Sequence, residues 1–470
     1  MNKKKILASL GALMIGAVGI SGSALAADPG DILGSETGSL TVHKFAKAPG
    51  EIEGSRDGSA VDPDAFANLT PLQGVTFTAQ KINQYDGKDV DLSKESGWDA
   101  LDGFKSNFEE GKATLGDAVE KVTAENGEAK FEKLAVGAYW VKETADTGNN
   151  NITDKAKPFL VTVPMPGKTA GTWNYDIHAY PKNSTATADK QFVPGDAHSY
   201  SDVVSWGLSV EIPAFGEGNT LTSLKFEDQL PAELSLATDG VTVKGGDTDF
   251  VKDTDFTVSE DGKKVTITIN DTGRAKLKAG DKVVANVKTN VDTAVKGAIK
   301  NDATVTVNDA NMKVEDSSYW GSLKINKTAT GTETRLKGAE FQVFASEQDA
   351  KDLKNPISGA KWDGNNVFTT NEQGEIVLDG ILTAETGTTL YVREITAPAG
   401  YVKDDTVHAV NVLPNDQGAV EITVENAQRT TNPMPELGSS GMIALYSIVG
   451  LAVAGALATA GIQARKSAVK

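Results

Sequence analysis

Lysine, carboxylate and asparagine side chains recur at the ends of apolar, strand-like segments, and these are the residues best placed to do chemistry. Lys327 comes two residues after Ile325, at a spacing that puts side chains on one face of a β-strand. Glu394 and Asn426 end apolar stripes in the same way. All three are therefore predicted to point into one core. Because a buried, isolated charge is costly, the three groups should contact one another or change their protonation.

The predicted chemistry is a covalent crosslink between the lysine and the asparagine. Burial favours the neutral amine of Lys327 and the neutral acid of Glu394. A neutral amine is a nucleophile, and a protonated carboxyl group can polarise an amide carbonyl. Attack on Asn426 would release ammonia and leave an isopeptide bond. The alternative for each residue taken singly is an exposed lysine or a simple surface ion pair.

The same set of residue types occurs in two earlier parts of the chain. In the first part, Lys44 and Glu143 end apolar stripes, and Asn183 is the predicted partner of the lysine. In the middle part, the corresponding residues are Lys190, Asp228 and Asn301. This recurrence favours crosslinking over coincidental surface residues. Each bond would form once, as self-modification, so the chain is not predicted to be an enzyme.

The elements that must position these groups are β-strands. Short segments alternate apolar and polar residues, many of them β-branched, and Gly, Asn and Asp separate the segments. Such segments are typical of antiparallel strands in β-sandwiches. The expected fold class is therefore all-β, with tandem immunoglobulin-like sandwiches. A helical interruption is predicted between Trp98 and Val122, where apolar residues approach helical spacing.

An internal repeat divides the chain into blocks. Residues 38–44 (GSLTVHK) match residues 321–327 (GSLKINK), so the first and last blocks are predicted to be copies of one module. The middle block lacks these strings and is expected to be a different sandwich. The predicted domains are 28–185, 186–316 and 317–429.

The two ends are predicted to lie outside the fold. Residues 1–27 have the basic start, apolar run and small-residue cleavage site of a secretory signal peptide. Residues 430–470 hold a short tether, an uncharged stretch long enough for a C-terminal transmembrane helix, and a basic tail. The chain is therefore expected to be exported, with the precursor transiently held in the membrane.

Composition excludes several function classes. The 470 residues include 46 basic and 64 acidic side chains, for a net charge of −18, which argues against nucleic acid as a partner. With no Cys and four scattered His, the sequence offers no thiol nucleophile, no metal-ligand spacing and no Ser/His/Asp set. No cofactor and no metal are predicted.

Three strings carry a family resemblance. Residues 390–401 resemble the E-box of self-crosslinking sandwiches in Gram-positive surface proteins, with Glu394, Pro398 and Tyr401 in place. Residues 173–182 (WNYDIHAYPK) resemble the pilin motif of sortase-assembled shaft pilins. The sorting-signal pattern L-P-x-T-G falls on Met434, Pro435, Glu436, Leu437 and Gly438, where Met replaces Leu and Leu437 stands in the Thr position.

The chain thus resembles a sortase-assembled Gram-positive major pilin, with CnaB-like first and last domains and a CnaA-like middle domain. The resemblance implies that a class C sortase joins the carboxyl of Leu437 in one subunit to Lys182 of the next, head to tail. It also implies accessory tip or base pilins, a housekeeping sortase, attachment to peptidoglycan, and a role in surface adhesion. The alternatives are a monomeric wall-anchored adhesin that binds a host matrix protein or glycan, and a secreted wall enzyme. The sequence names no host receptor.

Overall fold

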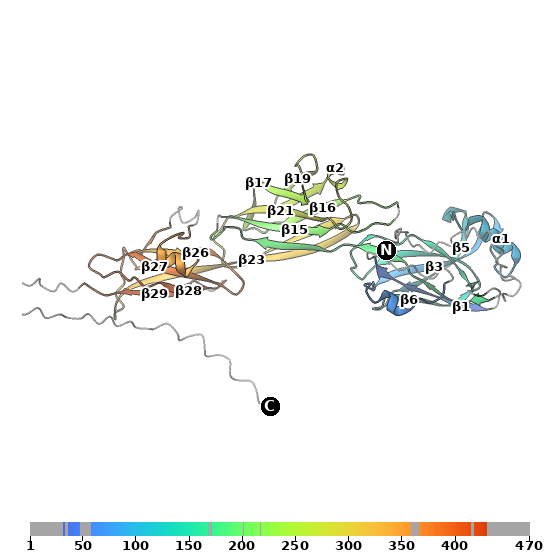
Figure 1. Cartoon of the computed structure of the whole chain (residues 1–470), viewed down its shortest axis with the longest axis horizontal. Coiled ribbons are helices and arrows are strands. Elements are labelled where there is room, and N and C mark those ends of the chain that lie inside the picture. Colours follow the sequence, from blue (N-terminus) through green and yellow to red (C-terminus); the bar gives the residue numbers. More distant parts are fainter. Residues whose placement is uncertain are drawn as a thin grey trace, which may run out of the picture.

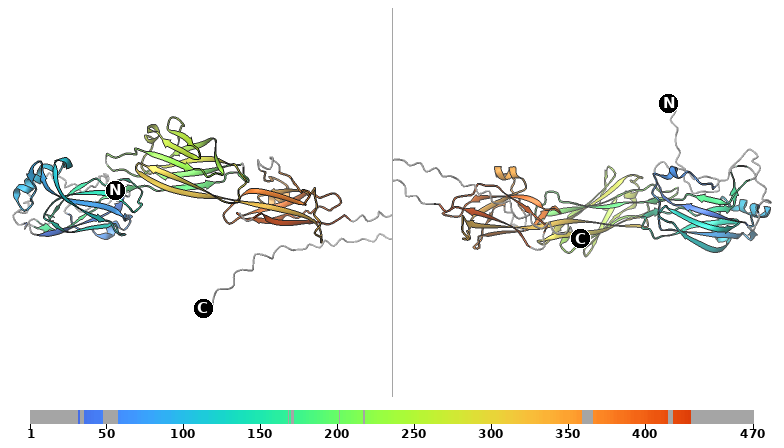
Figure 2. Two further views of the ribbon diagram at one scale, coloured as in Figure 1. Left: turned by 180° about the vertical axis from the view of Figure 1, so that it is seen from behind. Right: turned by 90° about the horizontal axis from the view of Figure 1, so that it is seen from below.

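The computed structural model describes residues 32, 36–47, 58–167, 169, 172–200, 202–216, 218–358, 366–414 and 418–429. Three β-rich blocks follow one another along the long axis of the molecule (Figures 1 and 2). Each block has its own buried apolar cluster, and strands far outnumber helices. The all-β class predicted from alternation is confirmed.

The described residues of the first block form thirteen strands and three short helices. Its strands are β1 (Thr37–His43), β2 (Phe45–Ala46), β3 (Val75–Tyr85), β4 (Lys88–Asp89), β5 (Ala113–Val122), β6 (Glu128–Ala135), β7 (Gly137–Asp146), β8 (Ile152–Asp154), β9 (Phe159–Val163), β10 (Met165–Pro166), β11 (Trp173–Asn174), β12 (Asp176–Ala179) and β13 (Lys182–Thr185). Its helices are η2 (Pro63–Phe66), α1 (Glu95–Phe104) and η3 (Glu110–Lys112).

Two layers of strands enclose the core of this block. One layer has the order β4-β3-β7-β9, with β5 paired to β3, and the other contains the sheets β12-β1-β6 and β2-β13-β8. Strand β1 runs parallel to β12, and β2 runs parallel to β13. Apolar side chains from both layers, among them Leu40, Phe77 and Phe131, are fully buried between them.

The predicted helix between Trp98 and Val122 is correct only in its first part. Helix α1 ends at Phe104, and residues 113–122 form strand β5 instead. The backbone of β5 pairs with β3 from Tyr85 to Thr76, while Val119 and Val122 are 41% and 54% exposed. The apolar residues of this segment therefore form no helical face, and pairing with a long neighbouring strand decides its conformation.

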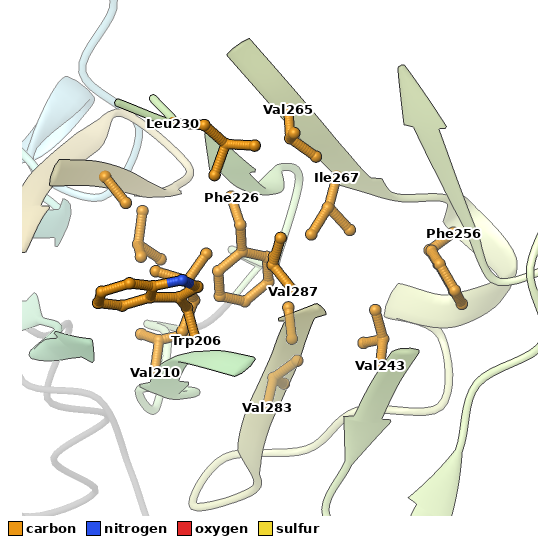
Figure 3. Close-up of a cluster of buried hydrophobic side chains, with 14 of the residues drawn as sticks. Trp206, Val210, Phe226, Leu230, Val243, Phe256, Val265, Ile267, Val283 and Val287 are labelled. Atoms are coloured by element: carbon orange, nitrogen blue, oxygen red, sulfur yellow. The ribbon is translucent and has the colours of Figure 1, made fainter. Parts of the chain in front are cut away.

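The middle block is a sandwich of two sheets. Its elements are β14 (Ala188–Val193), β15 (Val203–Glu211), β16 (Leu224–Gln229), β17 (Leu234–Gly245), β18 (Thr248–Asp249), β19 (Phe256–Asp261), β20 (Lys264–Ile269), α2 (Asp271–Arg274), β21 (Lys282–Val291), β22 (Gly297–Val307) and β23 (Ala310–Ala329). Sheet β14-β15-β21-β17-β18 packs on the sheet that contains β19-β20-β16-β22-β23. Trp206 and Phe226 lie side by side between the sheets (Figure 3), and both are fully buried.

The last block is a smaller sandwich. Its elements are β24 (Glu340–Phe344), α3 (Glu347–Asp352), β25 (Phe368–Thr369), β26 (Glu375–Thr383), β27 (Thr388–Thr396), β28 (His408–Val412) and β29 (Val420–Asn426). Strands β26 and β29 pair with the second half of β23, antiparallel and parallel respectively. The opposite sheet has the order β25-β24-β27-β28.

The two junctions between blocks are built differently. Strand β23 spans 20 residues without a break, pairs with β22 of the middle block over Ala310–Trp320, and then pairs with β26 from Tyr319 onwards. It therefore crosses the predicted boundary at 316/317. The first and middle blocks instead share no strand: residues 186–187 join β13 to β14, and Asp154 at the end of β8 accepts hydrogen bonds from Gly216 N (2.7 Å) and Asn219 Nδ2 (2.6 Å).

The predicted signal peptide and C-terminal membrane segment lie outside the described residues. Within the part of the chain that is described, no helix is long and apolar enough to cross a membrane.

Candidate crosslinking sites

In the first block, the three predicted residues form a closed triangle of polar contacts. Lys44 Nζ lies 2.9 Å from Glu143 Oε2 and also donates a hydrogen bond to Asn183 Oδ1. Asn183 Nδ2 donates to Glu143 Oε1 over 2.8 Å. The side chains of Lys44 and Glu143 are 0% and 1% exposed, and Asn183 is fully buried. Amine, acid and carboxamide therefore meet in a site closed to water.

The strand arrangement explains why these three side chains converge. Lys44 lies between β1 and β2, and Asn183 lies on β13, which runs parallel to β2 as its neighbour. Glu143 projects from β7 in the opposite layer. The Lys44 amine also lies 5.5 Å from the centre of the Phe77 ring. The lysine and asparagine thus share one layer, and the acid reaches them across the core.

Burial decides the protonation of the lysine. Desolvation lowers the pKa of Lys44 to about 8, and the attraction of Glu143 opposes this shift without cancelling it. A large share of the amine is then neutral near pH 8, whereas an exposed lysine would be almost entirely charged. The site therefore generates a nucleophilic amine.

The middle block brings its predicted residues together with a different layering. Lys190 Nζ lies 2.6 Å from Asp228 Oδ1, and Asn301 Nδ2 lies 3.5 Å from Asp228 Oδ2. Asp228 and Asn301 lie on β16 and β22, which are neighbours in one sheet, while Lys190 lies on β14 of the other. Burial lowers the pKa of Lys190 and raises the pKa of Asp228. Both shifts favour the neutral forms.

The last block repeats the layering of the first. Lys327 on β23 and Asn426 on β29 lie on parallel neighbouring strands, and Glu394 lies on β27 in the opposite sheet. Asn426 Nδ2 donates to Glu394 Oε1 over 2.9 Å, whereas Lys327 Nζ donates to the carbonyl oxygen of Val424, also over 2.9 Å. Burial lowers the pKa of Lys327 to about 8 and raises the pKa of Glu394.

In all three sites the acid contacts the amide nitrogen of the asparagine. The chemistry predicted from the sequence instead has the acid polarising the carbonyl group. In the first and middle sites, the second carboxylate oxygen lies against the lysine, so the carboxyl group bridges the amine and the amide nitrogen. A carboxyl group in this position can carry a proton from one nitrogen to the other.

Two main-chain donors near these sites were not predicted. Ala156 N donates to Asn183 Oδ1 over 2.7 Å, and Asp404 N donates to Glu394 Oε2 over 2.6 Å. Both lie in the connection between the acid-bearing strand and its antiparallel neighbour. Main-chain N–H groups occur at almost every residue, so no residue type marks the ones that will serve a site.

Lys182 lies next to Asn183 on β13 but points to the other side of the strand. It is half-buried, whereas Asn183 is fully buried. The side of the chain on which Lys182 lies is partly covered near Tyr180. The Tyr180 ring stacks on Phe66 of η2, and its hydroxyl accepts a hydrogen bond from Val61 N. The sorting-motif residues 434–438, including Leu437, lie outside the described residues.

These features define an elongated structural protein made of β-sandwiches in series, each with a buried lysine, acid and asparagine. Residues 35–184 match the family model of the Gram-positive pilin subunit D1, N-terminal domain. Residues 321–428 match that of the SpaA prealbumin-like fold domain.

Whole-chain relatives have the same character. The chain is 31% identical to fimbrial subunit type 2 of Actinomyces naeslundii over 94% of this chain and 92% of that one. It is 27% identical to fimbrial subunit type 1 of Actinomyces viscosus, over 96% and 95%. The full-length major pilin SpaD of Corynebacterium diphtheriae superposes with a TM-score of 0.63 at 27% identity, covering 86% of this chain and 100% of SpaD.

The chain belongs to the family of Gram-positive fimbrial subunits. It is a structural pilin of a cell-surface fimbrium, as the predicted resemblance to a pilin implied.

Proposed function

We propose that the chain is the shaft subunit of its fimbrium and that a class C sortase polymerises it. The Leu437–Gly438 peptide bond breaks, and the Leu437 carbonyl carbon forms an amide with Lys182 Nζ of the next subunit. Different surfaces meet at the two ends of such a contact, so it does not close and a filament grows. A housekeeping sortase then attaches the polymer to peptidoglycan, and accessory pilins join its tip or base.

The observation that carries this proposal is that two adjacent residues lie on opposite sides of one strand. Asn183 points into the closed first site, while Lys182 lies on the other side of the same short strand and keeps part of its surface exposed. Pro181 precedes Lys182 and has no N–H to donate, which suits the end of a strand where an enzyme can approach. This placement supports Lys182 as the amine that joins subunits.

The proposal includes one internal isopeptide bond per block, joining Lys44 to Asn183, Lys190 to Asn301, and Lys327 to Asn426. The neutral amine attacks the amide carbon, the carboxyl group moves a proton from the amine to the amide nitrogen, and ammonia leaves. No other reactant is needed. The burial of each lysine and the contact of each acid with its asparagine support this reaction.

The polymerisation is tested by Lys182→Ala in cells that carry the sortase. The high-molecular-weight ladder on a denaturing gel should disappear while the secreted monomer persists. Lys155→Ala is the matched control, because Lys155 is an exposed lysine on the segment that neighbours β13. An unchanged ladder in Lys182→Ala would refute the assignment of the linking lysine. Single anchored chains in the unmodified protein would instead indicate a monomeric adhesin.

A further inference from the structure

The amide of Asn183 is held in one orientation by groups of opposite character. Its oxygen accepts hydrogen bonds from Lys44 Nζ and from the main-chain N–H of Ala156, the latter over 2.7 Å. Its nitrogen faces Glu143 over 2.8 Å. Rotating the amide by half a turn would place the NH₂ group against two donors. The carbonyl oxygen is therefore fixed between the attacking amine and a main-chain donor.

At the other two sites, neither the lysine nor a main-chain N–H of the described part of the chain donates to the asparagine oxygen. Among the described residues, Asn301 Oδ1 and Asn426 Oδ1 are buried and have no hydrogen-bond partner. In the last block the corresponding connection also supplies a main-chain N–H, but Asp404 directs it at the acid Glu394. The first and last sites share their layering of lysine, asparagine and acid, yet they differ in which reacting group receives the main-chain hydrogen bond.

We propose that the main-chain N–H of Ala156 is an oxyanion donor for the first crosslink, which makes this the fastest-forming of the three bonds. This inference rests on the proposed isopeptide chemistry and adds a catalytic group to it. A preorganised N–H aimed at an oxygen that gains charge in the transition state stabilises that state more than the ground state. The buried site strengthens the effect, because water does not screen it.

This reaction needs no reactant from outside the chain. The lone pair of Lys44 Nζ forms a bond to Asn183 Cγ, and the carbonyl π electrons move to Oδ1, where the Ala156 N–H holds the oxyanion. Glu143 takes a proton from the attacking nitrogen and delivers it to Nδ2. The Cγ–Nδ2 bond then breaks, the carbonyl re-forms, and ammonia leaves. The middle and last sites must pass through the same intermediate without this donor.

The sharpest test removes the donor and changes little else. In the full chain made by cell-free translation, alanine at position 156 is replaced by lactic acid, which exchanges the N–H for an ester oxygen. Samples are quenched in acid at intervals, and crosslinked peptides from each block are measured by mass. Removing one such donor typically slows a reaction about 10²–10³-fold. That slowing is expected for the first crosslink alone, with the middle and last crosslinks unchanged.

Two further measurements keep the test decisive. Ala156→Gly retains the N–H and should crosslink at the rate of the unmodified chain. Limited proteolysis of the first block shows whether the ester chain folds. If it does not fold, the test becomes a comparison of crosslinking rates within the unmodified chain. There the first crosslink should form at least about tenfold faster than the middle one, because donor loss costs about 10²–10³-fold. In the middle site the acid also bridges lysine and asparagine, but Asn301 Oδ1 has no donor among the described residues.

The role of Ala156 and the existence of the first crosslink fail by different outcomes. Equal rates in the ester and unmodified chains, or a first crosslink that forms no faster than the middle one, would overturn the role of Ala156 and leave the crosslinks standing. If Asn183 of the unmodified chain keeps its side-chain amide and no ammonia is lost there, the first crosslink itself is overturned.

Discussion

Replacing Glu143 by glutamine tests the link between the buried acid, the first crosslink and the stability of the first block. The side chain keeps its size and can still contact Lys44 and Asn183, but it can no longer move a proton. The crosslink should not form, so this block should keep one ammonia, about 17 Da, that the unmodified chain loses.

The expected loss of stability follows from the length of chain that the bond closes. Lys44 and Asn183 are 139 positions apart. Closing a loop of that length restricts the unfolded chain by about 5 kcal/mol in the chain-entropy description used for disulfides. For a block of this size, that loss corresponds to a fall in melting temperature of about 10–20 °C.

The assay combines intact mass with calorimetry of the mature chain. Glu128→Gln is the matched control, because Glu128 lies in the same block, is 43% exposed and pairs only with His43 among the contacts described. It should still lose the ammonia, as the unmodified chain does, and its melting temperature should not change. A Glu143→Gln chain that still loses the ammonia would refute the role of the acid. A chain that lacks the bond but melts at the unmodified temperature would refute the entropy argument.

Of four further predictions, two concern pH, one the last site and one a block junction. Formation of the first crosslink should slow about tenfold per pH unit below pH 8, because the attacking amine must be neutral and the pKa of Lys44 is about 8; a rate independent of pH between 5 and 8 would contradict this. In Asn183→Ala, Lys44 stays unlinked. Denaturant unfolding of this variant should show a free energy of unfolding that rises from about pH 8 towards pH 10.5, because over this range the unfolded chain binds more protons than the folded chain. In Asn426→Ala the last block should show no loss of ammonia relative to the mass of its own sequence, and the other crosslinked peptides should be unchanged in mass spectra. Gly380→Ala should lower the melting temperature more than Gly400→Ala. Both glycines have positive φ, but only at Gly380 would the new Cβ meet a side chain, 2.5 Å from Tyr200 Cδ1. The free energies of unfolding of the two variants should differ by about 1–3 kcal/mol.

Strand parity was sufficient to predict which polar side chains lie inside. The rule that alternate residues share a face placed Lys327, Glu394 and Asn426 in the core, and all three are buried. It worked because each of these strands continues without a break up to its polar residue, so the alternation of faces is kept. The recurrence of the same residue types then located the first and middle sets, which the structure also brings together.

Other features could not be found in this way. Strand β5 depends on pairing with β3, which is distant in sequence, so its own apolar spacing was misleading. The N–H groups of Ala156 and Asp404 have no side-chain signature. The orientation of each acid towards the amide nitrogen depends on sub-ångström placement across two layers. Periodicity predicts which face a residue occupies, but it does not predict the contacts made there.

The uninterrupted course of β23 has a consequence for the flexibility of the fimbrium. Bending between the middle and last blocks would break ladder hydrogen bonds on both sides of one strand, so these two blocks should move as a single stiff rod. Rotation at the first-to-middle junction would break hydrogen bonds such as those of Asp154, but no ladder of a strand shared by the two blocks. A fibre made of such subunits should therefore curve at regularly spaced joints, and its persistence length should depend on the first-to-middle junction and on the links between subunits.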